Sequence, residues 1–343
     1  MLNDVRIQQT VDQLPRLTIA VVGDFFLDKY LDLDARLTEK SVETGLDAYQ
    51  VTRVRTSPGA GGTVANNLAA LGVGRIVALT VIGEDGEGFE LKRALVARGV
   101  DVTHVIEAAG RCTPTYTKPM LGDGCGPARE LNRLDIKNRT PTPATLVGEM
   151  TRRLDQVVAD SDAVIVADQV SEPDCGVVTL AVRERLAELA ERHAKKPIVA
   201  DSRERIGLFR KMITKPNQSE CLGAVAARSD ATDRAAVEAA AQELARRTGR
   251  PVYCTLGRDG ILFTTGQASI RVPAFPVTGP IDVVGAGDST TAGIVCGLCT
   301  GLDPIDAATL GNLIASITIR QLGTTGTASP EQILSRWRER SRD

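Results

Sequence analysis

The apolar positions of this chain form short continuous runs that are separated by stretches of helical period. Five runs have the length of a buried strand, and they span residues 17–23, 75–82, 162–168, 197–201 and 251–256. Apolar residues recur every three or four positions between the runs, over 62–71, 88–98, 175–193 and 234–247. This alternation predicts an α/β fold in which a mainly parallel, doubly wound sheet is covered by helices on both faces. Ligands of such sheets bind beyond the carboxyl ends of the strands.

Two stretches, residues 30–57 and 113–135, interrupt the alternation. Their short alternating segments, such as 49–55, predict strands outside the main sheet, which form either a small β lid or ordinary surface hairpins. No repeat or low-complexity linker divides the chain, so residues 1–343 are expected to form one domain with these two insertions. Because unpaired strand edges favour association, the lid strands are also expected to join two copies in a homodimer.

Composition narrows the possible partners. The formal net charge of -2 and the small number of aromatic residues, four Tyr, six Phe and one Trp, leave no cationic or stacking surface for nucleic acid. The N-terminus lacks the apolar core of a signal peptide, and no apolar run approaches the ~20 residues of a membrane-spanning helix. The seven cysteines have no disulfide-framework spacing. We therefore expect a cytoplasmic protein with reduced thiols and with no nucleic-acid or membrane partner.

The strongest chemical signal is the segment Asp282-Val-Val-Gly285-Ala286-Gly287-Asp288, which precedes a helical stretch at 289–299. Glycines let a backbone approach a ligand closely, and a helix N-terminus directs N–H groups and a positive dipole end towards an anion. Asp288 could accept the proton of a hydroxyl that attacks a phosphorus atom held there. The helix terminus is expected to keep the pKa of Asp288 low. Read alone, the segment also fits a helix start with an acidic cap.

Further polar residues follow the other predicted strands. Asp24 and Asp28 come after the run 17–23, where Asp24 also suits a turn. Asn217 and Glu220 could face one hydrated cation or form a helix cap. A tight turn would equally explain the glycines at 255–260, and a helical Asn such as that at 312 is usually a solvated surface residue. The remaining candidates lie at a glycine-rich helix start, at two strand ends and in a late helix: Gly61, Gly62, Asn66, Asp168, Thr255, Gly257 and Asn312.

Together these motifs resemble the ribokinase-like PfkB family of carbohydrate kinases. The segment 282–288 is similar to the C-terminal family signature, 61–66 to Gly-Gly-x-x-x-Asn, and 217–220 to Asn-x-x-Glu, in the family order over nearly the whole chain. No Gly-x-x-x-x-Gly-Lys-Ser/Thr loop is present, which disfavours a P-loop enzyme. The glycines at 83–88 are interspersed with acidic residues, which disfavours a dehydrogenase.

The resemblance implies transfer of a phosphoryl group from ATP to a sugar hydroxyl, with Mg²⁺. It implies that Asp288 is catalytic, supported by Gly285, Ala286 and Gly287, and that Asp282 belongs to a possible K⁺ site, although Val283 and Val284 replace frequent threonines. Mg²⁺ would be held through water by Asn217 and Glu220. The implied substrate residues are Asp28, Gly61, Gly62, Asn66 and Asp168, and the implied nucleotide residues are Asn217, Glu220, Thr255, Gly257 and Asn312. Thr63 stands where ribokinase has Lys.

Within this family the chain looks most like the kinase domain of the heptose-phosphate kinase/ADP-heptose synthase group, through 22–30, 114–120 and 214–220. This implies a phosphorylated sugar such as heptose 7-phosphate, whose phosphate could meet Lys118, Arg129 or Arg133. After Asp168, the sequence Gln-Val-Ser-Glu replaces the Tyr-Gly-Lys-Gly type. No nucleotidyl-transfer domain is expected, so the chain should only phosphorylate. The alternatives are a nucleoside kinase of the same fold and a non-catalytic sugar- or nucleotide-binding regulator.

Overall fold

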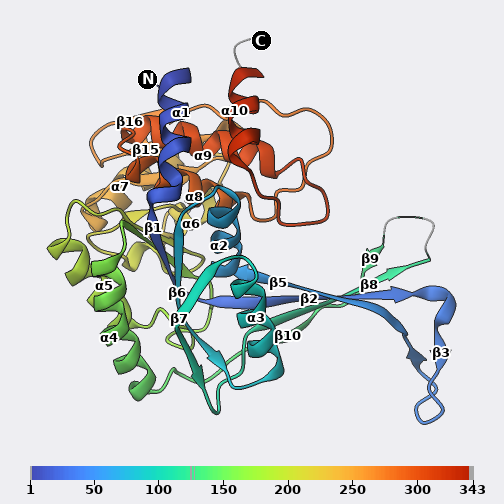
Figure 1. Ribbon diagram of the computed structural model, residues 1–343. Helices are drawn as coiled ribbons and strands as arrows, with labels where there is room; N and C mark the ends of the chain where they lie inside the picture. The colour runs from blue at the N-terminus through green and yellow to red at the C-terminus, as the bar shows by residue number, and fades with distance from the viewer. Residues whose placement is uncertain (1, 124–125, 127, 340–343) are drawn as a thin grey trace.

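A nine-stranded sheet crosses the centre of the molecule, as the computed structural model of residues 2–123, 126 and 128–339 shows (Figure 1). Seven neighbouring strands are parallel, and β15 and β16 add an antiparallel edge. The strand order is β16 (Ser269–Val272), β15 (Ile261–Thr264), β14 (Val252–Thr255), β13 (Ile213–Thr214), β12 (Ile198–Ser202), β11 (Ala163–Asp168), β1 (Thr18–Gly23), β6 (Arg75–Gly83) and β7 (Val100–Ala108).

Successive strands are added to this sheet on opposite sides of β1. Strands β6 and β7 lie on one side of β1, and β11 to β14 lie on the other. Connections therefore leave the carboxyl ends of β1 and β11 in opposite directions and open a crevice between them. All five predicted strand runs correspond to strands of this sheet, with ends that differ by at most one residue. The predicted doubly wound α/β architecture is confirmed.

Helices cover both faces of the sheet. One layer contains α1 (Asp4–Gln13), α2 (Gly61–Ala70), α3 (Gly86–Val96), α8 (Ala286–Cys299), α9 (Pro304–Thr318) and α10 (Pro330–Glu339), and the opposite layer contains α4 (Ala144–Asp160), α5 (Leu180–Arg192), α6 (Gln218–Ala224) and α7 (Arg234–Thr248). Helices α1 and α10 lie side by side at the end of the molecule that is far from the lid (Figure 1), and the Trp337 indole donates a hydrogen bond to Asp4.

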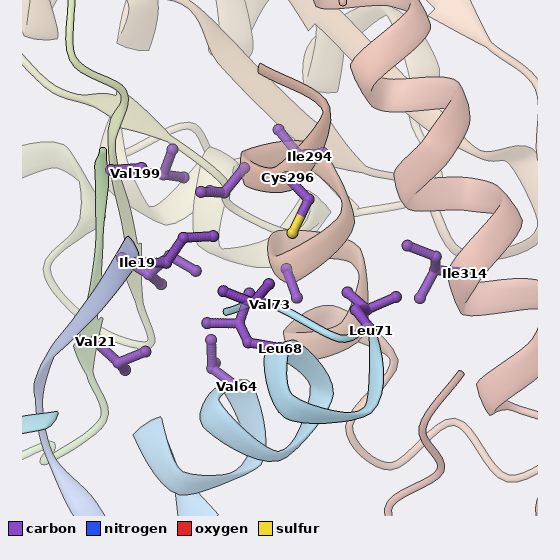
Figure 2. Packing of buried hydrophobic residues seen from close by; sticks show 14 of the residues in the cluster. Ile19, Val21, Val64, Leu68, Leu71, Val73, Val199, Ile294, Cys296 and Ile314 are labelled. Carbon is purple, nitrogen blue, oxygen red and sulfur yellow. The ribbon is translucent and has the colours of Figure 1, made fainter. Parts of the chain in front are cut away.

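Side-chain alternation along the strands divides the core in two. Ile19 and Val21 of β1 face the layer of α2 and α8, whereas the neighbouring Ala20 and Val22 face the layer of α4 to α7. Figure 2 shows Val64 and Leu68 of α2 close to Ile19, with Ile294 and Cys296 of α8 nearby. Leu68 is fully buried, which is worth roughly 1.5–3 kcal/mol relative to an exposed side chain. Both helices that begin at predicted glycine motifs are thus anchored directly on the sheet.

A second, five-stranded sheet, here called the lid, projects from the main body (Figure 1). Its strands are β10 (Leu134–Ile136), β8 (Thr115–Gly122), β2 (Phe25–Asp34) and β5 (Val51–Ala60), and β9 (Arg129–Glu130) pairs with β8. A short hairpin of β3 (Glu39–Lys40) and β4 (Asp47–Ala48) lies between β2 and β5. Strand β2 follows β1 after a single residue, and β5 runs directly into α2. The lid strands therefore start closer to the main sheet than the range 30–57 suggested.

The six cysteines in the part of the chain that the structure describes are free thiols, and four of them are buried. The seventh, Cys125, lies outside the described residues. A search of the described helices finds none with the length and apolarity that crossing a bilayer requires.

The crossing of α8 and α9 gives a stability prediction. A Cβ atom at Gly293 would lie 2.9 Å from the Gly311 Cα, so Gly293→Ala should lower the free energy of unfolding by about 1–3 kcal/mol through overpacking. The matched change Gly148→Ala in α4 meets no atom within 4 Å and should raise it by up to ~1 kcal/mol through helix propensity. Urea unfolding of both variants provides the measurement. Equal effects would show that the two helices can separate at no cost.

Candidate active site

The N-terminus of α8 forms the centre of the site. Gly285 caps the helix in the left-handed region, with φ 79°, and a Cβ there would lie 3.3–3.4 Å from Thr325 and Thr63. The N–H of Ala286 is already bonded to the Val283 carbonyl. The N–H groups of Gly287 and Asp288 donate to no acceptor in the described chain. At this helix start, Gly287 and Asp288 therefore have N–H groups that could donate to an anion, whereas the N–H of Ala286 closes the turn.

Asp288 lies in the first turn of α8, and its pKa is raised to about 7. Burial is the largest cause and the nearby Asp201 carboxylate is the second, while Lys215 and Arg203 act in the opposite direction. The expectation that the helix terminus keeps this pKa low is wrong, because burial and a like charge outweigh the dipole. A carboxylate with a pKa near neutrality is a better proton acceptor than a fully acidic one.

A buried ion pair faces this helix end. The Lys215 ammonium lies 2.9 Å from an oxygen of Asp201, and it lies 3.6 Å from where a Cβ of Gly287 would be. Burial acts to lower the pKa of Lys215, but attraction to Asp201, Glu220 and Asp288 outweighs it and raises this pKa, so the ammonium stays charged. Sequence reasoning assigned no role to either residue. Their positions, at a strand end and directly before the Pro-Asn motif, were the available signal.

Asn217 and Glu220 form a capping box at the start of α6. The Asn217 side chain accepts from the Glu220 N–H at 2.9 Å, and Glu220 Oε2 accepts from the Asn217 N–H at 2.8 Å. Glu220 Oε1 has no hydrogen-bond partner in the described chain, and burial, followed by Asp201, raises the pKa of the side chain. No cluster of three or more His, Cys, Asp or Glu side chains within the described ranges could enclose a metal. The set fits Mg²⁺ that keeps most ligands as water and phosphate.

One cavity brings together most of the predicted nucleotide residues. Thr255, Gly257, Ala286, Gly287 and Asn312 all line it. Much of its remaining wall is apolar and suits a purine base, and it is formed by Ala274, Phe275, Pro276, Val277, Ile281, Val283, Ala315 and Ile319. The Asn312 amide donates to the carbonyls of Val272 and Pro273 at 3.1 and 3.0 Å. Asn312 is therefore buried and fixes the wall of the cavity instead of lying on a solvated helix surface.

The lid places Asp28 near this centre. Asp28 forms an ion pair of 3.0 Å with Lys118, whose ammonium also donates to the Tyr30 hydroxyl. The Asp28 carboxylate is close enough to Asp288 to contribute to the rise in the pKa of Asp288. A Cβ at Gly59 would come within 2.5 Å of an Asp28 oxygen, so the glycine on the facing strand makes room for the carboxylate.

The predicted substrate residues at the start of α2 are packed against the lid base. A Cβ at Gly61 would meet the Phe25 ring at 2.8 Å, and one at Gly62 would meet Pro58 at 2.4 Å. Asn66 donates weakly, at 3.4 Å, to the Pro58 carbonyl, while its Oδ1 is buried without a partner. The two glycines are thus required by close packing of α2 against the lid, whatever else they contact.

Asp168 and Asp24 are fully engaged inside the protein. Asp168 is buried and pairs with the Arg205 guanidinium at 2.7 Å and with the Ser202 hydroxyl at 2.6 Å. Asp24 accepts three backbone N–H bonds, from Gln169, Val170 and Val177. Burial, together with Asp168, raises the pKa of Asp24 to about 6. The structure therefore does not bring the Asp168 carboxylate to an open site, and both acids instead hold the loop after β11.

Three further predicted residues are placed as follows. Asp282 accepts N–H bonds from Val284 and Gly323 and so joins the two loops that flank α8 and α9. Arg133 makes a two-point contact with Asp135 and lies over the Tyr116 ring, with 4.1 Å between the guanidinium carbon and the ring centroid. Arg129 is exposed on β9, towards the outer part of the lid.

Comparison with known proteins identifies the family of the chain. Residues 18–332 match the profile of the pfkB family carbohydrate kinases. The chain is 29% identical over 322 residues to the bifunctional protein HldE of Trichlorobacter lovleyi, covering 93% of this chain and 62% of that protein. It is 31% identical over 335 residues to HldE of Caulobacter sp., covering 94% of this chain and 64% of that protein. The chain thus spans under two thirds of the length of these relatives.

Solved structures share the fold at low sequence identity. Arabidopsis thaliana ribokinase, complexed with ribose and ATP, superposes with a TM-score of 0.69 at 16% identity and covers 93% of this chain and 98% of that one. Escherichia coli phosphofructokinase-2, in complex with potassium, gives 0.69 at 19% identity, covering 95% of this chain and 100% of that one.

The raised pKa of Asp288 predicts how phosphoryl transfer depends on pH. The carboxyl group accepts a proton only when it is ionised, so kcat/KM should fall as the pH drops below about 7 and level off above it. The measurement is a pH profile of kcat/KM between pH 5 and 9, with thermal unfolding followed over the same range. The residual activity of Asp288→Asn should lack this ionisation. A wild-type profile that is flat from pH 5 to 8 would contradict the assignment.

Proposed function

Because the chain belongs to the pfkB family of carbohydrate kinases, we propose that it transfers the terminal phosphoryl group of ATP to a hydroxyl of a phosphorylated sugar such as heptose 7-phosphate. The observation that carries the proposal is the position of Asp288. This half-buried carboxylate directly follows Ala286 and Gly287, which line the nucleotide cavity, and it is close enough to Asp28 of the lid strand β2 for that charge to raise its pKa. A proton acceptor between a nucleotide cavity and a hydroxyl-binding carboxylate is the arrangement that phosphoryl transfer needs.

Each residue of this centre has a distinct part in the proposed reaction. Asp28 accepts hydrogen bonds from acceptor hydroxyls and orients them, and Asp288 takes the proton of the attacking hydroxyl. The free N–H groups of Gly287 and Asp288, together with the Lys215 ammonium, stabilise the negative charge on the transferred group. Because the transition state of phosphoryl transfer is loose, positioning and charge stabilisation provide most of the catalysis.

Metal ions would complete the phosphate end of the site. Glu220, through its free Oε1, and Asn217 would hold hydrated Mg²⁺, which would neutralise charge on the nucleotide phosphates. Asp282, whose oxygens already join two loops, is proposed to lie beside a K⁺ site made mainly of backbone carbonyls.

The choice of a phosphorylated acceptor rests on the similarity to the two HldE proteins. Lys118 is largely buried in an ion pair with Asp28, where its ammonium could donate to a sugar hydroxyl. Arg129 and Arg133 are less suitable than expected from sequence, because Arg129 is exposed on β9 and Arg133 is committed to Asp135. We also propose a cytoplasmic location, since free thiols persist in reducing compartments.

A screen of MgATP with phosphorylated sugars, free sugars and nucleosides tests the proposed reaction. Heptose 7-phosphate should give a higher kcat/KM than ribose, fructose or any nucleoside. Asp288→Asn should lower kcat at least ~100-fold with little change in the KM for ATP, because it removes only the proton acceptor. Asp160→Asn, an exposed acid at the end of α4, serves as the matched control. Near-normal turnover by Asp288→Asn would rule out the proposed role, and preference for a nucleoside would change the acceptor class.

We also propose that the lid joins two copies of the chain. The register of β2, β5 and β10 places Leu31, Val54, Leu134 and Ile136 on one lid face, and Val54 and Leu134 are 52% and 62% exposed. The opposite face carries Asp28, Tyr30 and Lys118. An apolar sheet face of this kind suits burial against a second lid.

The dimer proposal predicts a change in mass. Val54→Glu should convert a particle of twice 36.5 kDa into a monomer, because it places a charge in the apolar interface. Val42→Glu, at a fully exposed position outside the lid sheet, should leave the mass unchanged. Light scattering with size-exclusion chromatography distinguishes these results. A monomeric wild-type protein at working concentration would overturn the proposal.

A further inference from the structure

A second cavity lies between the base of the lid and the loop after β11, and it shares no residue with the nucleotide cavity. Phe26 and Tyr116 of the lid form part of its wall, residues 169–172 and 175–177 form another part, and Arg111, Lys137, Asn138 and Thr142 contribute the rest. The residues Gln-Val-Ser-Glu that depart from the family pattern are therefore cavity residues. The mechanism described above leaves this cavity without a role.

The cavity adjoins the proposed sugar-binding position. Tyr116 is the register partner of Asp28, so both side chains lie on the same lid face, about 5 Å apart along the sheet. The Phe26 ring meets Tyr116 edge to face, with 5.2 Å between the centroids, and Phe26 precedes Asp28 by two residues on the same strand. The cavity wall and Asp28 are therefore neighbours on one lid face, so an acceptor held at Asp28 would lie beside this cavity.

The walls of the cavity are held in place from several directions. Asp24 receives three N–H bonds from the loop after β11, and the Arg205 guanidinium donates to the carbonyls of Val170 and Ser171. On the other side, Arg111 donates to the Cys175 and Thr140 carbonyls. Because these bonds already fix the loop, binding a ligand here would cost little loop entropy.

The charges in the cavity are unevenly matched. Neither Lys137 nor Arg111 forms an ion pair with a carboxylate in the described chain, and burial lowers the pKa of Arg111. The two acids of the cavity already have partners. Asp24 accepts hydrogen bonds from backbone N–H groups, and Glu172 forms an ion pair of 3.5 Å with Arg139. One oxygen of Glu172, Oε2, is nevertheless buried without a hydrogen-bond donor. The Arg111 guanidinium already donates to two carbonyls and to the Thr142 hydroxyl, so Lys137 is the cation of this cavity whose ammonium is available to a ligand. One available cation and one unsatisfied acceptor indicate a ligand that carries both an anionic group and a hydroxyl.

We propose that this cavity binds the distal end of the acceptor, with Lys137 holding its phosphate, the neighbouring Arg111 guanidinium adding positive charge, and Glu172 accepting a hydroxyl hydrogen bond. This inference rests on the proposed function, because it presumes that a sugar lies at Asp28. The phosphate is thus assigned to the segment that links the lid to α4, and not to the lid cations Lys118 and Arg133, which are engaged with Asp28 and Asp135.

Kinetics with paired substrates test the inference. Lys137→Met should raise the KM for heptose 7-phosphate about ten- to a hundredfold with kcat nearly unchanged, because one charge-assisted contact to phosphate is lost. The same variant should leave kcat/KM for the unphosphorylated heptose unaltered, and Lys137→Arg should restore most of the affinity. Lys195→Met, which removes an exposed lysine elsewhere, is the control. Equal effects on the two heptoses, or no effect on either, would overturn the assignment.

A direct binding measurement separates this inference from the proposed function. Inorganic phosphate, titrated without nucleotide and followed by ³¹P NMR, should bind the wild-type protein and bind Lys137→Met at least tenfold more weakly. If heptose 7-phosphate is not a substrate but phosphate binding still depends on Lys137, the acceptor is wrong and the subsite stands. If heptose 7-phosphate is phosphorylated but neither its KM nor phosphate binding responds to Lys137, the subsite is wrong and the proposed function stands.

Discussion

The burial of one carboxylate at the end of β1 constrains the whole acceptor side of the molecule. Asp24 is the single residue between β1 of the main sheet and β2 of the lid, and its oxygens receive three N–H groups from the loop after β11. An unpaired buried carboxylate would be very costly, so these segments must stay together for the ion to be tolerated. The lid base, the central strand and the second cavity are therefore positioned by one shared set of hydrogen bonds.

At the proposed phosphate-binding end of the site, the arrangement depends on a cluster of one cation and three carboxylates. Lys215 is a buried cation among Asp201, Glu220 and Asp288, and their mutual repulsion contributes to the raised pKa of Asp288 and of Glu220. Such a cluster is poorly balanced without further cations, and bound Mg²⁺ would relieve it. In the proposed reaction, this repulsion would favour a nucleotide that carries Mg²⁺ over the nucleotide alone.

Sequence reasoning located the features that depend on local chemistry. The strand runs, the glycine turn at Gly285 and the capping positions of Asn217 follow from periodicity and turn preferences, and all lie where expected. It failed where partners are distant in the chain. Nothing near Asp168 indicates that Arg205 will neutralise it, and the pKa of Asp288 depends on Asp201, which lies on another strand. Long-range pairing and burial are properties of the assembled fold.

The adjoining terminal helices have a practical consequence. Helices α1 and α10 are joined by the bond between Trp337 and Asp4 at the end of the molecule that is far from the lid. Ends that lie together at a surface tolerate fusion and circular permutation well. A fluorophore, an affinity handle or a surface tether attached at either end would leave the lid free to approach a second lid. The protein could thus be immobilised in one orientation, with the lid pointing away from the point of attachment.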